Sequence, residues 1–215
     1  MVAFVSQKRE AIHRAVRDMY AAVASAPEQP FHFPTGRLAC ELVGYPSERL
    51  AGLPERTLES FAGVGYPFAA DVIREGDRVL DVGSGSGTDA LICARLVGPR
   101  GRVYGLDMTA PMRAKLQETA AAAGIANLEV LEGDAEAIPL ADASVDVVTT
   151  NGVLNLNTAS EEELMRLPGV GPSKAKAILE LRTQLKGFKK VEDLMRVKGI
   201  GRKTFRKLVP MLKLD

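Results

Sequence analysis

Apolar and polar residues alternate with a helical period over the first third of the chain. Positions 7–24 repeat every three to four residues, which predicts an amphipathic helix. Residues 25–37 are irregular and rich in proline and aromatic side chains. Two shorter helical patterns over 54–63 and 67–76 each end at a glycine, a common helix terminator. We expect a helical N-terminal cap over residues 1–70.

From residue 78 the pattern changes to short apolar runs separated by helical segments. The runs predict strands at 78–82, 102–107, 128–134 and 145–154, with helices at 88–97 and 111–124. Strands that alternate with helices favour a parallel sheet with right-handed crossovers. We therefore expect an α/β domain over residues 71–155, a partial Rossmann-like sheet of about four parallel strands.

After Asn157 the strand pattern stops, and the rest reads as a small all-α domain over 156–215. Thr158 and Ser160 are candidate N-caps for the first of four helical stretches, at 158–167, 172–185, 191–197 and 202–212. Two similar glycine turns, "LPGVG" and "VKGIG", repeat 30 residues apart, each directly before a helix. This internal repeat predicts two equivalent helical hairpins.

Charge is distributed unevenly along the 215 residues. The formal net charge is +1, yet residues 156–215 hold 14 Lys and Arg against 7 Asp and Glu, while the preceding residues hold 14 against 20. Such asymmetry suggests different partners for the two parts, a polyanion for the basic one; a solvated charged face is the alternative.

No run of about 18 apolar residues predicts a membrane span, and the charged N-terminus lacks a signal-peptide core, so a cytoplasmic location is expected. Two cysteines are expected to be reduced thiols, with no metal site.

The most informative chemistry lies in the glycine turn after the first strand. Asp81 precedes Gly83, Gly85 and Gly87 on a G-x-G-x-G spacing, which fits a dinucleotide fingerprint poorly. A packing turn would also explain the glycines. Further acids end the second and third strands, at Asp107 and Asp134. A carboxylate at the second strand end suits a ribose diol, and an acid before the turn suits an ammonium group.

On these motifs, residues 10–156 resemble class I S-adenosylmethionine-dependent methyltransferases, in particular the UbiE and arsenite-methyltransferase-like group. The resemblance implies S-adenosylmethionine as cofactor. It places the methionine moiety at Asp81 and the glycine loop, the ribose at Asp107, and the transferred methyl near Asn151. The full implied cofactor set is Asp81, Gly83, Ser84, Gly85, Gly87, Asp107, Met108, Asp134, Ala135 and Asn151.

The methyl acceptor is not identified by these motifs. Tyr20, His32 and Tyr66 are candidates on the substrate side, with a structural role for His32 as the alternative. We expect no arsenic chemistry, because Val64 stands where the resembling enzymes carry a cysteine and Cys93 falls in an apolar helix. The family's sheet has seven strands, so a sheet of four leaves an open edge that another helix or a second copy of the chain could cover.

Residues 154–212 resemble the helix-hairpin-helix domain of ComEA-type competence proteins, which implies DNA binding through phosphates without sequence specificity. Helix corners with a solvated basic face are the alternative. The implied backbone-contacting residues are Gly169, Val170, Gly171, Lys174, Lys198, Gly199, Ile200, Gly201, Arg202 and Lys203.

Three functional hypotheses stay open at this point. The chain is a methyltransferase tethered to DNA, a DNA-binding module with a truncated and non-catalytic cofactor domain, or a rearranged or constructed fusion. The two resemblances overlap at Leu154, Asn155 and Leu156, which suggests a crossover within this shared segment.

Overall fold

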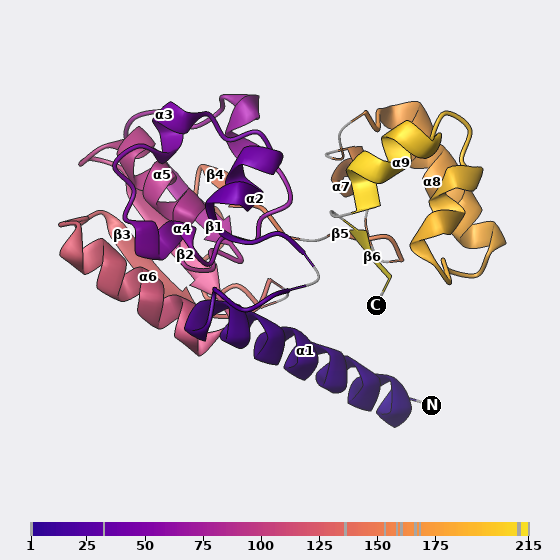
Figure 1. Cartoon of the computed structure of the whole chain (residues 1–215), viewed down its shortest axis with the longest axis horizontal. Helices are drawn as coiled ribbons and strands as arrows, with labels where there is room; N and C mark the ends of the chain where they lie inside the picture. Colours follow the sequence, from indigo (N-terminus) through magenta and orange to yellow (C-terminus); the bar gives the residue numbers. More distant parts are fainter. Residues whose placement is uncertain are drawn as a thin grey trace. The chain divides into compact units, whose positions relative to one another are not determined.

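A computed structural model describes residues 2–31, 33–135, 137–152, 154–157, 159, 161–165, 167, 169–209 and 212–214. The chain forms two compact units, residues 1–151 and 152–215. Figure 1 shows the helices and the sheet of the first unit and the mainly helical second unit, and each is described here by itself.

The N-terminal unit is built on a parallel sheet with the strand order β3-β2-β1-β4. Its strands are β1 (Arg78–Val82), β2 (Arg102–Asp107), β3 (Leu128–Glu132) and β4 (Val147–Thr150). Val79 of the central strand pairs with Val103 and Val147, and all three strand pairs are parallel. Helices α5 (Thr88–Val97) and α6 (Ala110–Ala122) connect the first three strands. The predicted four-stranded parallel sheet is thus confirmed, and β4 forms one edge, where Val148 is 57% exposed.

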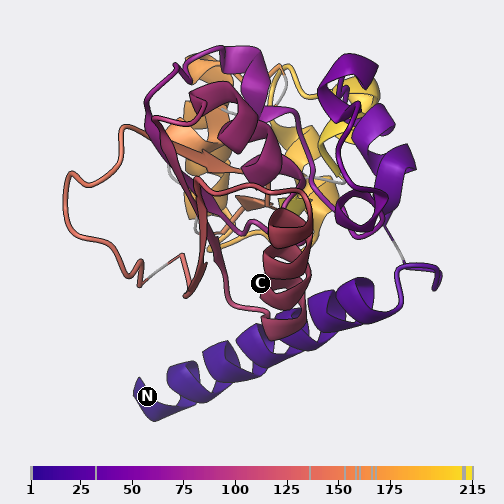
Figure 2. The ribbon, with the colours of Figure 1, turned by 90° about the vertical axis from the view of Figure 1, so that its left-hand side faces the viewer.

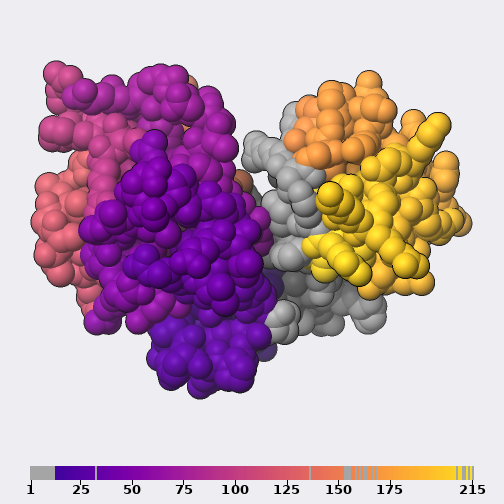
Figure 3. Space-filling view, turned by 45° about the horizontal axis from the view of Figure 1, so that its top comes forward, coloured from indigo at the N-terminus to yellow at the C-terminus, as the bar shows by residue number. Residues whose placement is uncertain are grey.

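The cap before the sheet contains more elements than the sequence pattern predicts. They are α1 (Val2–Ser25), α2 (Gly36–Leu42), α3 (Ser47–Leu50), α4 (Glu55–Leu58) and the 3-10 turn η1 (Pro67–Ala70). The helix predicted over 67–76 is wrong beyond Ala70, because Asp71 takes a left-handed conformation (φ 46°) that ends the turn. The predicted long helix is confirmed as α1, whose C-terminal part lies against α6 (Figures 1 and 2). In Figure 3 the cap segments, in indigo and purple, form one face of this unit.

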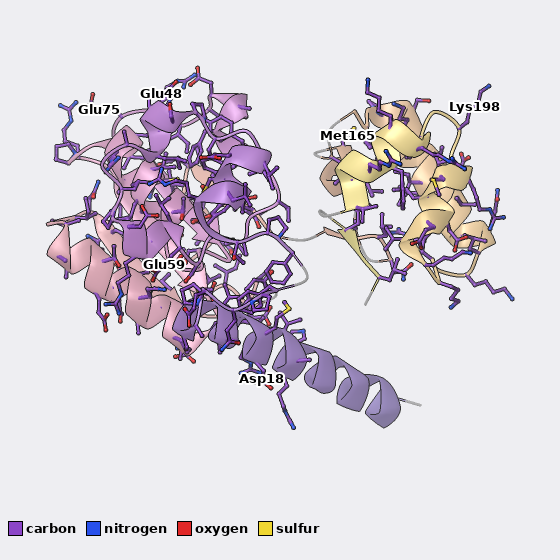
Figure 4. All side chains as sticks on the ribbon, viewed as in Figure 1. Asp18, Glu48, Glu59, Glu75, Met165 and Lys198 are labelled. Carbon is purple, nitrogen blue, oxygen red and sulfur yellow. The ribbon has the colours of Figure 1, made fainter. Side chains whose placement is uncertain are left out.

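A buried lysine on α6 ties the cap to the sheet domain. Lys115 is 6% exposed, and its Nζ donates to the Ala24 carbonyl (3.0 Å) and the Ser60 hydroxyl (2.7 Å). The same ammonium pairs with Glu59 at 2.6 Å, on the segment after α4 (Figure 4). A buried charge is stable only when paired and hydrogen-bonded, so this cluster fixes the end of α1 and the segment after α4 on α6.

The C-terminal unit contains β5 (Leu154–Asn155), α7 (Glu161–Met165), α8 (Pro172–Gln184), η2 (Val191–Arg196), α9 (Arg202–Leu208) and β6 (Leu212–Lys213). The expectation of no strand after Asn157 is wrong, since β6 pairs in parallel with β5. The stretch at 191–196 is a 3-10 helix. Leu164, Ile178, Leu194 and Leu208 are fully buried, and each such side chain contributes about 1.5–3 kcal/mol to stability. The candidate caps Thr158 and Ser160 lie outside the described residues. Within the described part of the chain, no helix has the length and apolarity to cross a bilayer.

Candidate ligand and nucleic-acid sites

The three loop glycines after β1 serve two different purposes. A Cβ placed on Gly83 meets no atom within 4 Å, and one on Gly85 meets only the sulfur of Met112 at 3.9 Å. A Cβ on Gly87 would overlap the side chain of Leu116 on α6. Gly87, with a left-handed φ of 98°, is also the N-cap of α5. Gly83 and Gly85 therefore leave open space beside the backbone, whereas Gly87 is required for packing.

Asp81, near the end of β1, carries an unpaired carboxylate oxygen. The side chain is 2% exposed; its Oδ1 accepts a hydrogen bond from the Thr149 hydroxyl (3.0 Å), while Oδ2 has no partner. Burial raises the pKa of Asp81 well above its ordinary value, and the neighbouring Asp89 carboxylate raises it further. The buried Ser84 hydroxyl also has no partner. A cationic or hydrogen-bonding ligand beside the open glycine loop would satisfy these atoms.

Asp107, at the end of β2, joins that strand to the glycine loop. Its Oδ2 accepts the Gly85 amide (2.9 Å) and its Oδ1 accepts the Thr109 amide (2.7 Å). Each carboxylate oxygen has a second lone pair, so hydroxyl donors could still bind there. Met108, beside it, is half-buried. Asp107 is thus oriented rigidly at the sheet edge expected for a ribose.

Helix α1 brings two polar side chains to the same edge. The Nδ1 of His13 lies 3.1 Å from the Oδ2 of Asp134, which follows β3. Burial raises the pKa of Tyr20, and the Asp107 carboxylate adds to that shift. The sequence motifs did not single out His13, although it lies seven residues before Tyr20 and hence on the same helix face. Ala135 is exposed.

Asn151, directly after β4, uses its whole amide to hold the loop at 63–66. Its Nδ2 donates to the Tyr45 hydroxyl (2.8 Å), Asp89 Oδ2 (2.8 Å) and the Gly65 carbonyl (3.0 Å). Its Oδ1 accepts the amides of Val64 and Gly65, both at 2.8 Å. The Tyr45 hydroxyl also donates to Asp89 Oδ1. The expected position of Asn151 near a transferred methyl group stays a prediction. The sequence motifs did not single out its partners Tyr45 and Asp89.

The remaining substrate-side candidates give less information. Tyr66 packs against the rings of Tyr45 and Phe68, with centroids 4.9 and 5.6 Å away. His32 lies outside the described residues. Both cysteines are buried, and burial raises the pKa of Cys40 to about 12 and that of Cys93 well above its ordinary value. Their thiols are therefore protonated at neutral pH, and a protonated thiol is a poor nucleophile.

The two glycine hairpins of the C-terminal unit have the same backbone geometry. Gly169 and Gly199 are left-handed (φ 78° and 90°), and the N-cap residues of α8 and α9, Gly171 and Gly201, are extended (φ −95° and −85°). Between each pair one apolar residue is buried, Val170 in the first hairpin and Ile200 in the second. The amides of Val170 and Ile200 bond back to the carbonyls of Leu167 and Val197, both at 3.0 Å. The predicted repeat is therefore real, and its middle residues anchor each turn.

Lys174 shows that the two hairpins lie side by side. Its Nζ donates to the Gly169 carbonyl of the first hairpin (2.7 Å). Its Cε would lie 3.0 Å from a Cβ placed on Gly199 in the second. Both turns thus form one surface, which we call the hairpin face, with Lys174 between them.

The basic side chains at the second hairpin have no carboxylate partner among the residues that the structure describes. Lys198, Arg202 and Lys203 are exposed, and Figure 4 shows Lys198 pointing away from the unit. Among the described residues after 151, Arg196 with Asp193 (3.8 Å) is the single ion pair. In the N-terminal unit, by contrast, carboxylates pair with Arg37, Arg56, Arg74, Arg78, Arg100, Arg102 and Arg113. The positive charge of the hairpin face is therefore available to an anionic partner.

The segment shared by the two resemblances packs with the C-terminal unit. Leu154 and Asn155 pair with β6, and Leu156 is fully buried in the core of this unit. Asn157 donates to the Leu214 carbonyl (2.7 Å) and accepts the Phe188 amide (2.7 Å). Asn151, in contrast, is bound into the N-terminal unit.

Comparisons with known proteins match the two parts of the chain to different families, with matches that overlap across the boundary between the units. A family model described as "Methyltransferase domain" matches residues 79–167, and one described as "Helix-hairpin-helix motif" matches residues 149–213, so both include 149–167. An arsenite methyltransferase of Halobacterium salinarum is 39% identical over 116 residues, which are 54% of this chain and 29% of that protein. ComE operon protein 1 of Bacillus subtilis is 48% identical over 56 residues, 26% of this chain and 27% of that protein.

Among solved structures, an arsenic(III) S-adenosylmethionine methyltransferase from Chlamydomonas reinhardtii aligns with a TM-score of 0.40 and 31% identity, covering 60% of this chain and 42% of that one. The chain spans less than a third of the length of the arsenite methyltransferase and of the ComE protein that it matches. The two family models and the two curated relatives show that a methyltransferase-like domain and a helix-hairpin-helix domain occur together in this chain.

Proposed function

We propose that the N-terminal unit binds S-adenosylmethionine at the edge of the sheet where β1 and β2 end. The observation that carries this proposal is the unpaired, buried Oδ2 of Asp81 beside the open space at Gly83. An ammonium group satisfies such an oxygen, Asp107 offers lone pairs to ribose hydroxyls, and Met108, Asp134 and Ala135 lie at the adenine end. When bound, this cofactor supplies an electrophilic methyl group, and the protein's task is to orient it toward an acceptor.

We also propose that the hairpin face binds the DNA backbone without sequence preference. Two equivalent turns with exposed glycines approach a phosphate backbone closely, and Lys198, Arg202 and Lys203 supply unpaired charge. In this proposal Val170 and Ile200 act indirectly, because their side chains are buried and hold the turns in shape.

Calorimetry and salt titration test the two proposals separately. S-adenosylhomocysteine should bind the full chain, and Asp107→Ala should weaken that binding; if the ligand gives no heat, the first proposal fails. If Lys174, Lys198, Arg202 and Lys203 neutralise roughly four phosphates, the slope of log K against log salt is about −3.6. Binding to duplexes of unrelated sequence should then fall about 150-fold between 50 and 200 mM salt, and affinity indifferent to salt refutes the second proposal.

A second candidate is a DNA-binding protein whose N-terminal unit binds ligand but transfers no methyl group. The exposed edge of β4 and the full use of the Asn151 amide in loop contacts favour it. Transfer of labelled methyl groups to a panel of small nucleophiles and to duplex DNA separates the candidates, with ligand binding confirmed in the same preparation.

A further inference from the structure

A second buried carboxylate, Asp89 in the first turn of α5, is linked to Asp81 through the end of β4: Thr149 pairs with Asp81, and Asn151, two residues further on, donates to Asp89. Asp89 is 5% exposed and Asp81 is 2% exposed. Their side-chain partners are neutral donors: the Thr149 hydroxyl for Asp81, and the Tyr45 hydroxyl and Asn151 amide for Asp89. In the part of the chain that the structure describes, no lysine, arginine or histidine pairs with either acid.

The other titratable groups facing the pair do not compensate its charge. Asp107 adds further negative potential at Asp81, and the nearby thiols of Cys40 and Cys93 are themselves held protonated by burial. Hydrogen bonding by the Thr149 hydroxyl and the Ala90 backbone lowers the pKa of Asp81 and so opposes the effect of burial. Removing two carboxylates from water without a nearby cation is strongly unfavourable, so the pair is more stable with a proton bound.

Electrostatics point in the same direction for both acids. Burial, and then repulsion by Asp89, raises the pKa of Asp81. Burial also raises the pKa of Asp89, to about 6, although the hydrogen bonds from Tyr45 and Asn151 oppose the shift. Protons taken up by such a pair belong to both groups together.

We propose that Asp81 and Asp89 share a proton in the ligand-free protein, and that an ammonium group arriving at the free oxygen of Asp81 displaces this proton into solvent. The inference rests on the proposed S-adenosylmethionine site and adds a proton to its binding equilibrium. The ammonium group of the ligand places one positive charge at the pair, and the pair releases one proton to solvent in exchange. Affinity for an amine-bearing ligand therefore rises with pH, by up to about tenfold per pH unit while the pair is protonated.

Calorimetry in two buffers with different ionisation enthalpies counts the proton. Below pH 6, where the pair holds its proton, S-adenosylhomocysteine is expected to release up to one proton, which appears as a buffer-dependent binding enthalpy that shrinks as the pH rises. The probe for comparison is 5′-methylthioadenosine, which keeps the nucleoside and thioether but lacks the α-ammonium and α-carboxylate groups, and it should release none. Binding of S-adenosylhomocysteine with the same enthalpy in both buffers overturns the inference while leaving the site intact. Absence of binding by either ligand overturns the site as well.

Variants test which residues hold the proton. Asp89→Asn should reduce the release seen with S-adenosylhomocysteine, and Asp81→Asn should both abolish it and weaken binding. Asp142→Asn, at an exposed acid, is the matched control and should leave the release unchanged. The wild-type comparison of the two ligands decides the question even if the buried variants fold poorly, and an unchanged release in a folded Asp89→Asn protein contradicts the sharing of the proton.

Discussion

The glycine loop after β1 allows a quantitative test of which positions serve folding and which leave room for a ligand. Gly83→Ala and Gly87→Ala introduce the same methyl group on left-handed backbone, with φ of 73° and 98°. That conformation costs an alanine roughly 1–2 kcal/mol at either position. At Gly83 nothing lies within 4 Å of the new methyl, so no further cost is expected.

At Gly87 the methyl group would overlap Leu116, which is fully buried. Forcing an extra carbon into a packed core costs about 1–3 kcal/mol more. Gly87→Ala should therefore lower the free energy of unfolding by about 2–5 kcal/mol, against about 1–2 kcal/mol for Gly83→Ala.

Urea denaturation followed by circular dichroism measures this difference, and thermal unfolding should show it as a gap of several degrees. Gly83→Ala should instead weaken binding of S-adenosylhomocysteine, because its methyl enters the open space of the loop. Equal destabilisation by the two variants, or a larger effect at Gly83, would refute the assignment of Gly87 to packing and Gly83 to the ligand.

Three further predictions concern the polar cluster and the hairpins. Asn151→Ala should destabilise the N-terminal unit by about 2–4 kcal/mol in urea titrations, because buried partners lose their hydrogen bonds, while the exposed neighbour Thr150→Ala should have little effect. Burial raises the pKa of Asp89 in the folded state to about 6, so protonated Asp89 stabilises the fold below pH 4 and this stabilisation is lost as the pH rises through 6. Asp89→Asn should flatten the pH dependence of the free energy of unfolding, by at most about 3 kcal/mol between these two pH values. Neutralising the three hairpin-face charges of Lys198, Arg202 and Lys203 should lower duplex affinity and reduce the slope of log K against log salt by about 3. Neutralising three exposed charges beyond the other end of α8, at Lys186, Lys189 and Lys190, is the control and should have the smaller effect.

Local patterns were sufficient to predict the elements whose residues repeat with a clear period. The strand–helix alternation predicted the four-stranded parallel sheet, and the repeated glycine turns predicted the two hairpins. The patterns failed where tertiary contacts decide the structure. The pair of β5 and β6 joins segments far apart in sequence, and Leu154 and Leu212 give no local signal for it.

The same distinction applies to the candidate sites. Asp81, Asp107 and the glycines were found because their spacing is local. Asp89 and Tyr45 were not singled out, because these two residues and Asn151 come from three segments that meet only in the folded chain. Likewise, nothing in the sequence separates Gly87 from Gly83, since the difference is the position of Leu116 on another helix.

The central claim is that one chain carries both an S-adenosyl ligand site and a duplex-binding face. Titration of S-adenosylhomocysteine by calorimetry into the full chain, already saturated at low salt with a duplex of arbitrary sequence, tests it most directly. The account predicts binding of about one ligand per chain while the duplex stays bound, because the two sites are built from separate units. A protein that fails to retain the duplex at low salt, or a complex that gives no heat with the ligand, would contradict it.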